Sequence, residues 1–393
     1  MKPLALAARL AGIVAALLVL AALAIQLGGH GYLWTALRYT YLQGHVTAHI
    51  DDARNFAQAA IAGGASPAPA NPARAQAALS DETFAYLQAH RSAAFVVAHR
   101  GERVHETYFA PYTAASRTNV FSVTKTIVTM IAGAAVADGI VPGFDAPLAT
   151  WITEYAAHPQ GAKATLAQLS SMTSGHDWSE HYYLPLNPTT ELYFGGDAAR
   201  TVLGRGFERE PGAGFEYSSA STQLLGLALG RALAAHEPGL TLAGYLSRRL
   251  WQPMGLADAS WSLDRPRERG GVELAYCCVH ASARDLARLG QLLLDGGRVG
   301  DRQLLPADFV KRMTTPNGFV RHYGHGLWMD PDHAHPFYFL QGHLGQYVIV
   351  VPSAELVIVR LGQFRPRANT RHPVIADEVY RYVDEGLRLI AAR

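Results

Sequence analysis

A serine and a lysine three positions apart form the pair most capable of chemistry in this chain. Ser122 and Lys125 stand at the start of an apolar run, residues 127–136, that predicts a helix. Positions i and i+3 share a helix face, so the lysine lies beside the serine hydroxyl. An amine of lowered pKa activates such a hydroxyl, and the helix N-terminus offers backbone N–H groups to an oxyanion. Taken alone, the pair also fits an N-cap serine beside a solvated lysine.

A tyrosine with a serine two positions later forms a second candidate group. Tyr217 and Ser219 follow the glycine-rich turn at residues 210–214 and precede a predicted helix. A phenol held near a cation has a lowered pKa and shuttles protons. The alternative is a tyrosine packed in a loop, with its hydroxyl bonded to backbone.

A third candidate group stands where a strand begins, at residues 341–347. It contains His343, Gly345 and Gln346. Small residues at this point let a ligand approach the strand backbone, and a backbone N–H from the strand completes an oxyanion hole. A tight turn with a bonded histidine is the alternative.

The elements that must position these groups follow from hydrophobic patterns and turn signals. A helix is predicted from its N-cap Ser80 to about His90, followed by a hairpin. Further helices are predicted at 122–138, 220–235, 241–250, 282–294 (with Ser282 as N-cap) and 373–390. Strands are predicted at 94–99, 103–109, 326–329, 337–341, 346–351 and 356–361, with residues 347–351 as a buried central strand. Strands at both ends and helices between them favour one sheet with a helical lobe beside it.

The order of the three groups resembles the serine β-lactamase and penicillin-binding superfamily. The likeness is nearest to its class C-like branch, with 6-aminohexanoate-dimer hydrolase and the β-lactamase-like carboxylesterases, and covers about residues 80–390. Supporting stretches are residues 170–175, 250–256 and 281–290. The resemblance implies an α/β (α+β) β-lactamase/transpeptidase-like fold: an antiparallel sheet flanked by helices, with a mostly helical second lobe.

The resemblance also implies roles for individual residues. Ser122 is the expected nucleophile, Lys125 its partner and Tyr217 the tyrosine that exchanges protons with that lysine. The backbone N–H groups of Ser122 and Gln346 are the expected oxyanion hole. The expected substrate-binding residues are Ser219, His343, Gly345 and Tyr182, the last in a segment, residues 178–183, that matches a substrate loop. No metal or organic cofactor is expected.

Two departures from the family pattern bear on the substrate. His343 stands where β-lactamases have lysine, and Leu344 stands where they have a hydroxyl residue. A leucine forms no hydrogen bond to a substrate carboxylate, and histidine is only partly charged near neutral pH. The expected substrate is therefore a small ester, amide or short peptide. The alternatives are a sensor that binds cell-wall peptides or β-lactams without turnover, and a true β-lactamase or D-Ala-D-Ala peptidase.

Composition excludes several other classes of protein. The 393 residues carry a net charge of +2 without a long basic run, which argues against nucleic-acid binding. The histidines and cysteines form no metal-binding motif, and no Gly-x-Ser-x-Gly elbow of an α/β-hydrolase occurs. The cysteines are the neighbours Cys277 and Cys278. Because neighbouring Cα atoms are closer than the usual disulfide span, we expect two free thiols.

The N-terminus predicts export. Lys2 and Arg9 precede the uncharged run 10–27, which nearly spans a hydrocarbon core, and tyrosines and a tryptophan follow it. We expect residues 1–29 to be an anchor in a bacterial inner membrane, with a cytoplasmic N-terminus and a periplasmic domain. A cleaved signal peptide and a secreted domain are the alternative. Residues 30–79 are predicted to be a connector with an Ala/Pro/Gly linker, and residues 80–393 the hydrolase domain.

Overall fold

The computed structural model describes residues 2–64, 77–366 and 368–391. Its helices are α1 Lys2–Leu27, α2 Tyr32–Tyr39, α3 Asp81–Ala89, α4 Val123–Ala137, α5 Leu166–Ser170, α6 Pro188–Phe194, α7 Ala198–Leu203, α8 Ser219–His236, α9 Leu242–Leu246, α10 Ala283–Leu294, α11 Ala307–Met313 and α12 Asp377–Ala391. Its strands are β1 Ala57–Ile61, β2 Ser92–His99, β3 Glu102–Tyr108, β4 Thr118–Asn119, β5 Ala259–Leu263, β6 Val279–Ala281, β7 Arg298–Val299, β8 Arg302–Gln303, β9 Trp328–Asp330, β10 Phe337–Gly342, β11 Gln346–Val351 and β12 Leu356–Gly362.

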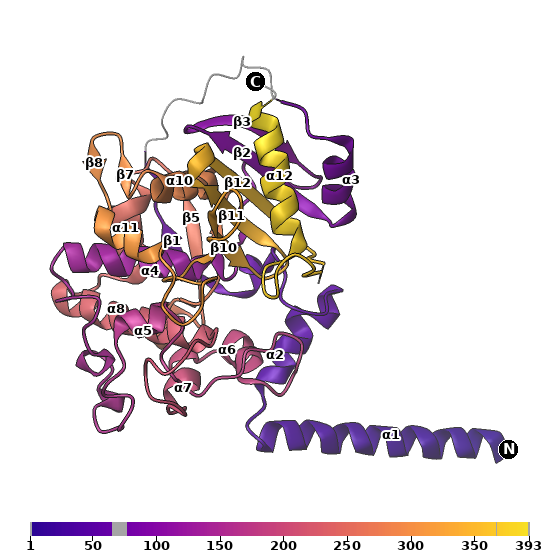
Figure 1. Cartoon of the computed structure of the whole chain (residues 1–393). Coiled ribbons are helices and arrows are strands. Elements are labelled where there is room, and N and C mark those ends of the chain that lie inside the picture. Colours follow the sequence, from indigo (N-terminus) through magenta and orange to yellow (C-terminus); the bar gives the residue numbers. More distant parts are fainter. Residues whose placement is uncertain (1, 65–76, 367, 392–393) are drawn as a thin grey trace.

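A six-stranded antiparallel sheet organises the domain, in the order β3-β2-β12-β11-β10-β9. The two central strands come from the C-terminal part of the chain, and β2 and β3 come from the start of the domain (Figure 1). Every residue of β11 is buried, as its continuous apolar sequence predicts.

The sheet separates two hydrophobic cores because successive side chains of a strand point to opposite faces. Val348 and Val350 join the larger core, which also contains residues of α4, α8 and α10. Tyr347 and Ile349 join the smaller core under α3 and α12. The alternation explains why these strands are apolar at every position.

A helical lobe lies beside the large sheet (Figure 1). Its central helices are α4 and α8, which pack against each other. Residues 123–135 of α4 are all buried, including Lys125 and the threonines at 124, 126 and 129. A second, four-stranded sheet in the order β1-β5-β6-β4 borders this lobe, and β4 leads into α4.

The structure confirms the predicted fold class and most of the predicted elements. Ser80 and Ser282 are N-caps that accept hydrogen bonds from backbone amides, as predicted. The last helix begins four residues later than predicted. The carboxylate of Asp377 accepts bonds from the amides of Thr370 and Arg371, which holds the preceding segment in a loop.

Part of the predicted connector is folded onto the domain. Residues 32–39 form α2, and residues 57–61 form β1, which pairs along its whole length with β5. The sequence prediction missed this second sheet, because its strands have two to five residues and β1 pairs with a partner about 200 positions away. From residue 65 onward, the Ala/Pro/Gly stretch of the predicted linker lies outside the described residues.

The prediction of two free thiols is wrong. Cys277 and Cys278 form a disulfide with a Cα–Cα distance of 3.7 Å, and both residues are buried. The Cα separation alone did not exclude this bond, because the direction of each Sγ also depends on the backbone dihedrals. Cys278 has a φ of 78°, the left-handed conformation that is uncommon for residues other than glycine.

A buried arginine holds the turn between β10 and β11. Arg360 of β12 has no exposed surface, and its Nη1 donates to the carbonyls of Leu344 and Gly345, each over 2.9 Å. Its Nη2 donates to the carbonyls of His90 and Phe364 over 2.7 and 3.0 Å. A Cβ at position 345 would lie 2.3 Å from Nη1, so glycine is required there. The turn that carries His343 is thereby fixed to the centre of the sheet.

We predict that Arg360→Met lowers the free energy of unfolding by about 3 kcal/mol, because several buried carbonyls lose their donor. Urea denaturation of the full chain in detergent measures the loss. The matched control is Arg100→Met, which removes an exposed arginine paired with Glu355 and should change stability by less than about 0.5 kcal/mol. Equal losses for both variants would contradict this role.

Candidate active site

Ser122 stands at the N-cap of α4, where the chain turns sharply. The preceding residue, Phe121, has a φ of 47°, and its amide donates to Asn119 Oδ1 over 2.9 Å. A bulky residue in this conformation is costly, and such strain gathers at functional sites. The turn brings Ser122 to the wall of a large cavity, at the mouth of a buried helix.

Lys125 is the most deeply buried cation of the candidate site, with 1% of its surface exposed. Its Nζ donates to Ser122 Oγ over 2.9 Å, to Ser219 Oγ over 3.1 Å and to the carbonyl of Tyr276 over 2.9 Å. Burial disfavours the charged ammonium and lowers the pKa of Lys125 to about 8, against the opposing charge of Glu180. A neutral amine is therefore accessible near neutral pH, beside the serine hydroxyl.

The carbonyl of Tyr276 is a partner of Lys125 that sequence analysis missed. No local pattern connects the two residues, which lie 151 positions apart. Tyr276 directly precedes the buried disulfide Cys277–Cys278, and Thr124 accepts a hydrogen bond from the amide of Val279. The segment that offers the carbonyl is thus held to α4 at both ends.

Tyr217 packs beside this pair, immediately before α8. Its ring lies 5.2 Å from that of Trp328, and Lys125 Nζ lies 5.1 Å from its centroid. The sequence predicted a lowered pKa, but burial and then the charge of Glu180 raise the pKa of Tyr217, while a hydrogen bond with Ser122 lowers it only in part. The prediction is wrong because desolvation outweighs the hydrogen bond with Ser122 and the charge of Arg365. The phenol is therefore protonated in the resting site.

Glu180 connects the loop at residues 178–183 to the catalytic centre. Its carboxylate accepts from the backbone amide of Ser219 over 2.8 Å and from the hydroxyl of Ser219 over 2.6 Å. Trp178 Nε1 and the hydroxyl of Tyr182 each donate to it over 2.7 Å. Four donors therefore satisfy this carboxylate, which lies close enough to Lys125 to raise the pKa of the amine.

Ser219 is buried, with 1% of its surface exposed, and bonds to both Lys125 and Glu180. It forms the first turn of α8, whose N-cap is Ser218. The sequence identified the segment around Glu180 but assigned the glutamate no role. The aromatic residues of that segment were the signal that could have pointed to Glu180, because they indicated a cavity wall.

The predicted third group lies in the turn between β10 and β11. His343 packs against Phe121 and Tyr182, with ring centroids 5.4 and 5.1 Å apart. Leu344 and Gly345 have φ of 63° and 83° and form the turn itself. Leu344 lines the cavity, whereas Gly345 lies behind its surface against Arg360.

Gln346 begins β11 and is fully buried. Its Nε2 donates to the carbonyls of His343 and Gly362 over 2.9 and 2.6 Å, and its Oε1 accepts from the amide of Gly362 over 3.0 Å. The side chain therefore ties the turn to the neighbouring strand, and the backbone of Gln346 remains the part expected to act in an oxyanion hole.

A cavity of about 1250 Å³ joins these groups. Ser122, Tyr217, Tyr182 and His343 all line it, so the structure brings together residues from four distant segments. The complete lining is residues 44–49, Arg91, Ser122, 180–184, Tyr217, 341–344, 363–365 and Asn369.

Residues 44–49 form a wall of this cavity that sequence analysis missed. Thr47 Oγ1 lies 3.3 Å from His343 Nε2, within hydrogen-bond distance. His49 is buried, and its Nε2 lies 3.2 Å from Gln363 Oε1. The sequence predicts a connector here, because the short turns of this segment carry no periodic pattern.

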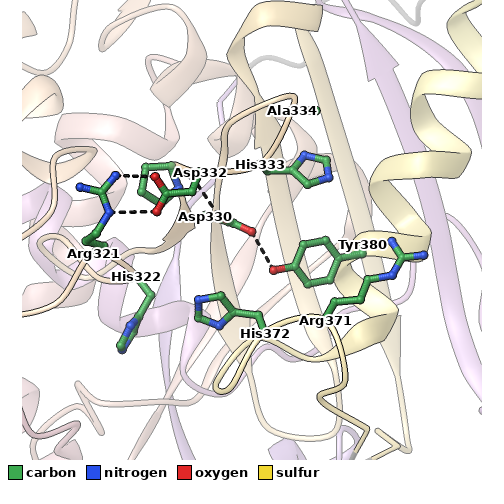
Figure 2. A pocket seen from close by; sticks show the side chains of 10 residues that line it. Arg321, His322, Asp330, Asp332, His333, Ala334, Arg371, His372 and Tyr380 are labelled. Atoms are coloured by element: carbon green, nitrogen blue, oxygen red, sulfur yellow. Dashed lines mark hydrogen bonds and ion pairs between the residues drawn. The ribbon is translucent and has the colours of Figure 1, made fainter.

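A second cavity, of about 460 Å³, contains none of the predicted site residues. Figure 2 shows Arg321 paired with Asp332, and Tyr380 bonded to Asp330, at its wall. Its histidines and carboxylates do not converge. Within residues 2–64, 77–366 and 368–391, no group of three or more His, Cys, Asp or Glu side chains is placed to hold a metal ion.

Known proteins resemble this chain in sequence and in fold. A 6-aminohexanoate-dimer hydrolase of Paenarthrobacter ureafaciens is 26% identical over 306 residues, 71% of this chain and 74% of that protein. A Bacillus anthracis structure described as a candidate 6-aminohexanoate-dimer hydrolase has a TM-score of 0.70 at 21% identity, over 91% of this chain and 93% of its own. A family VIII carboxylesterase has a TM-score of 0.58 at 17% identity, over 78% of this chain and 96% of its own.

These likenesses confirm the resemblance and the fold that the sequence predicted. The model of the β-lactamase family, described as "Beta-lactamase", matches residues 80–379. Because this match covers most of the chain, the protein belongs to the β-lactamase family.

Proposed function

We propose that this protein hydrolyses esters or amides through an acyl-enzyme on Ser122. The observation that supports it most directly is the 2.9 Å hydrogen bond between Lys125 Nζ and Ser122 Oγ, made by a lysine whose pKa is lowered to about 8. A base of this pKa is well matched to work near neutral pH. The neutral fraction of Lys125 can therefore remove the serine proton without a second base.

Acylation begins when the neutral amine of Lys125 takes the proton of Ser122 and Oγ attacks the substrate carbonyl carbon. The carbonyl π-bond opens, and the negative charge collects on its oxygen. The backbone N–H groups of Ser122 and Gln346 are the donors we propose for this oxyanion. The position of Ser122 at the mouth of α4 supports the first of them.

The leaving group then departs with a proton. Tyr217 holds its proton at rest and forms a hydrogen bond with Ser122, so it is the proposed donor to the leaving alcohol or amine. The ammonium of Lys125 restores the phenol. In deacylation, water attacks the ester carbonyl while the amine takes its proton, and that proton returns to Ser122 as the acid leaves.

The cavity wall bears on the substrate class. Leu344 lines the cavity and has no hydroxyl to bind a substrate carboxylate. His343 is surrounded by the rings of Phe121, Tyr182 and Tyr183 and bonds to Thr47. The missing hydroxyl at position 344 favours an ester or amide without the carboxylate of a β-lactam. The hydrolase and carboxylesterase relatives support an amide or ester substrate.

We also propose that α1 anchors the protein in a membrane. The stretch Ala7–Leu27 is long and apolar enough to cross a bilayer, with a mean hydropathy of 2.6 and no buried surface. An N-terminal helix of this kind also occurs in cleaved signal peptides. The basic residues Lys2 and Arg9 before the apolar stretch favour a cytoplasmic N-terminus and an exported domain. Recovery of the full-length mass from the membrane fraction tests the anchor.

Ser122 is the proposed nucleophile, and its substitution tests the proposal. Ser122→Ala should abolish labelling by a fluorophosphonate and lower kcat/KM for p-nitrophenyl butyrate by about a thousandfold or more. Tyr217→Phe should lower it by about a hundredfold. Ser353→Ala, a change at an exposed serine, is the control and should retain full activity. Undiminished labelling of Ser122→Ala would refute the assignment. A stable acyl adduct without turnover, seen by intact mass, would favour a sensor.

The dependence of kcat/KM on pH should report the protonation of Lys125. Lys125 acts as a base only when it is deprotonated, so kcat/KM should rise through pH 8 and level off above it. The carboxylate of Glu180 stabilises the ammonium, so Glu180→Gln should move the midpoint to lower pH. Tyr182→Phe removes one hydrogen bond of Glu180 but keeps the charge, so its midpoint should stay in place. A midpoint that rises or stays unchanged in Glu180→Gln would contradict this coupling.

A further inference from the structure

The outward face of α2 and of the 3₁₀ turn Tyr41–Gln43 is apolar. Trp34, Leu37, Tyr41 and Leu42 are all exposed, Leu42 to 73%. Trp34, Leu37 and Arg38 occupy positions i, i+3 and i+4 of α2, which is one face of the helix, and Tyr41 and Leu42 follow in the 3₁₀ turn after the C-cap Thr40. A surface helix of a soluble domain normally turns its apolar face inward. Here α2 and the turn after it expose four large apolar side chains.

A second group of exposed apolar residues lies next to α2. The loop before α6 exposes Tyr183, Leu184 and Leu186, the last to 66%. The hydroxyl of Tyr32, on the buried side of α2, donates to the carbonyl of Pro185 over 3.1 Å and connects the two segments. We call the combined surface the apolar rim; its residues are Trp34, Leu37, Tyr41, Leu42, Val46, Tyr182, Tyr183, Leu184 and Leu186.

The apolar rim continues into the cavity that contains Ser122. Val46, Tyr182, Tyr183 and Leu184 belong to both the rim and the cavity lining. A ligand that reaches the nucleophile from this side therefore crosses apolar side chains first. Large exposed apolar side chains gathered beside a cavity mark a binding site for a protein or a membrane.

The position of the rim next to α1 selects between those two partners. The membrane-length stretch ends at Leu27 and α2 begins at Tyr32, so four residues separate them and span at most about 14 Å. Figure 1 shows α2 directly beside the inner end of α1. With α1 in a bilayer, the rim lies within or next to the headgroup layer. Tryptophan, tyrosine and arginine are the side chains that favour this layer.

We propose that the apolar rim is embedded in the membrane interface, and that the cavity takes its substrate from the bilayer. This inference rests on the proposed function: the substrate is an ester or amide of an amphiphile with a hydrocarbon chain. The chain of the substrate crosses the rim while its carbonyl reaches Ser122. The chemistry at Ser122 is the acylation already described, and no further reactant is required.

The location of the rim is tested by fluorescence of the full chain in phosphatidylcholine vesicles. Leu42→Cys carries an environment-sensitive nitrobenzoxadiazole label, and the control is the same label at Phe84→Cys. Phe84 is exposed on α3, which Figure 1 shows apart from α1 and α2, at the upper right of the molecule. The label at 42 should shift to shorter wavelengths and be quenched by nitroxide lipids, and the label at 84 should not. Equal quenching of the labels at 42 and 84 would overturn the proposal. So would a label at 42 whose emission is the same with and without lipid, because a protein contact would then shield it.

The substrate class is tested with two esters. Tyr41→Glu/Leu42→Glu should lower turnover of p-nitrophenyl palmitate in vesicles about tenfold. It should leave turnover of water-soluble p-nitrophenyl acetate within about twofold, because neither residue lines the cavity. The control Phe84→Glu should leave both unchanged. An equal effect of the double variant on both esters would overturn the inference. Failure of the unchanged protein to hydrolyse either ester would instead refute the proposed function, whatever the label at 42 reports.

Discussion

The burial of one ammonium group constrains the whole candidate site. Lys125 lies inside α4 and has three neutral oxygen partners, from Ser122, Ser219 and Tyr276. Burial lowers the pKa of this amine and the charge of Glu180 opposes that shift, so the buried group needs hydrogen-bond partners, which these oxygens supply. The left-handed Phe121, the cap of α8 and the segment before the disulfide each place one of them.

The balance of charge around Lys125 depends on a loop from another part of the chain. Glu180 raises the pKa of the lysine against desolvation and also raises that of Tyr217. Burial keeps the phenol protonated, and the same carboxylate adds to that shift while it favours the charged form of the amine. Because Tyr182 and Trp178 donate to the same carboxylate, the cavity wall and the proton-transfer groups are parts of one network.

Sequence analysis predicted the parts of the site that depend on local spacing. Ser122 and Lys125 are one helical turn apart, and the strands at the centre of the sheet are continuous apolar runs. It missed Tyr276, Glu180 and residues 44–49, which reach the site only through contacts across the fold. The predictions for the pKa of Tyr217 and for the two cysteines were wrong for a related reason. Burial decides the pKa, and backbone conformation decides whether Cys277 and Cys278 can form a bond. The family match begins at residue 80, so the wall at 44–49 lies outside the matched residues.

A neutral amine at Lys125 is the central claim, and nuclear magnetic resonance of lysine side chains tests it most directly. The chain has four lysines, Lys2, Lys125, Lys163 and Lys311, so selective ¹³C and ¹⁵N labelling gives a sparse spectrum. The signal that disappears in Lys125→Met should titrate with a midpoint near pH 8 in the unchanged protein. A midpoint above pH 10, the range of a free lysine, would contradict the account.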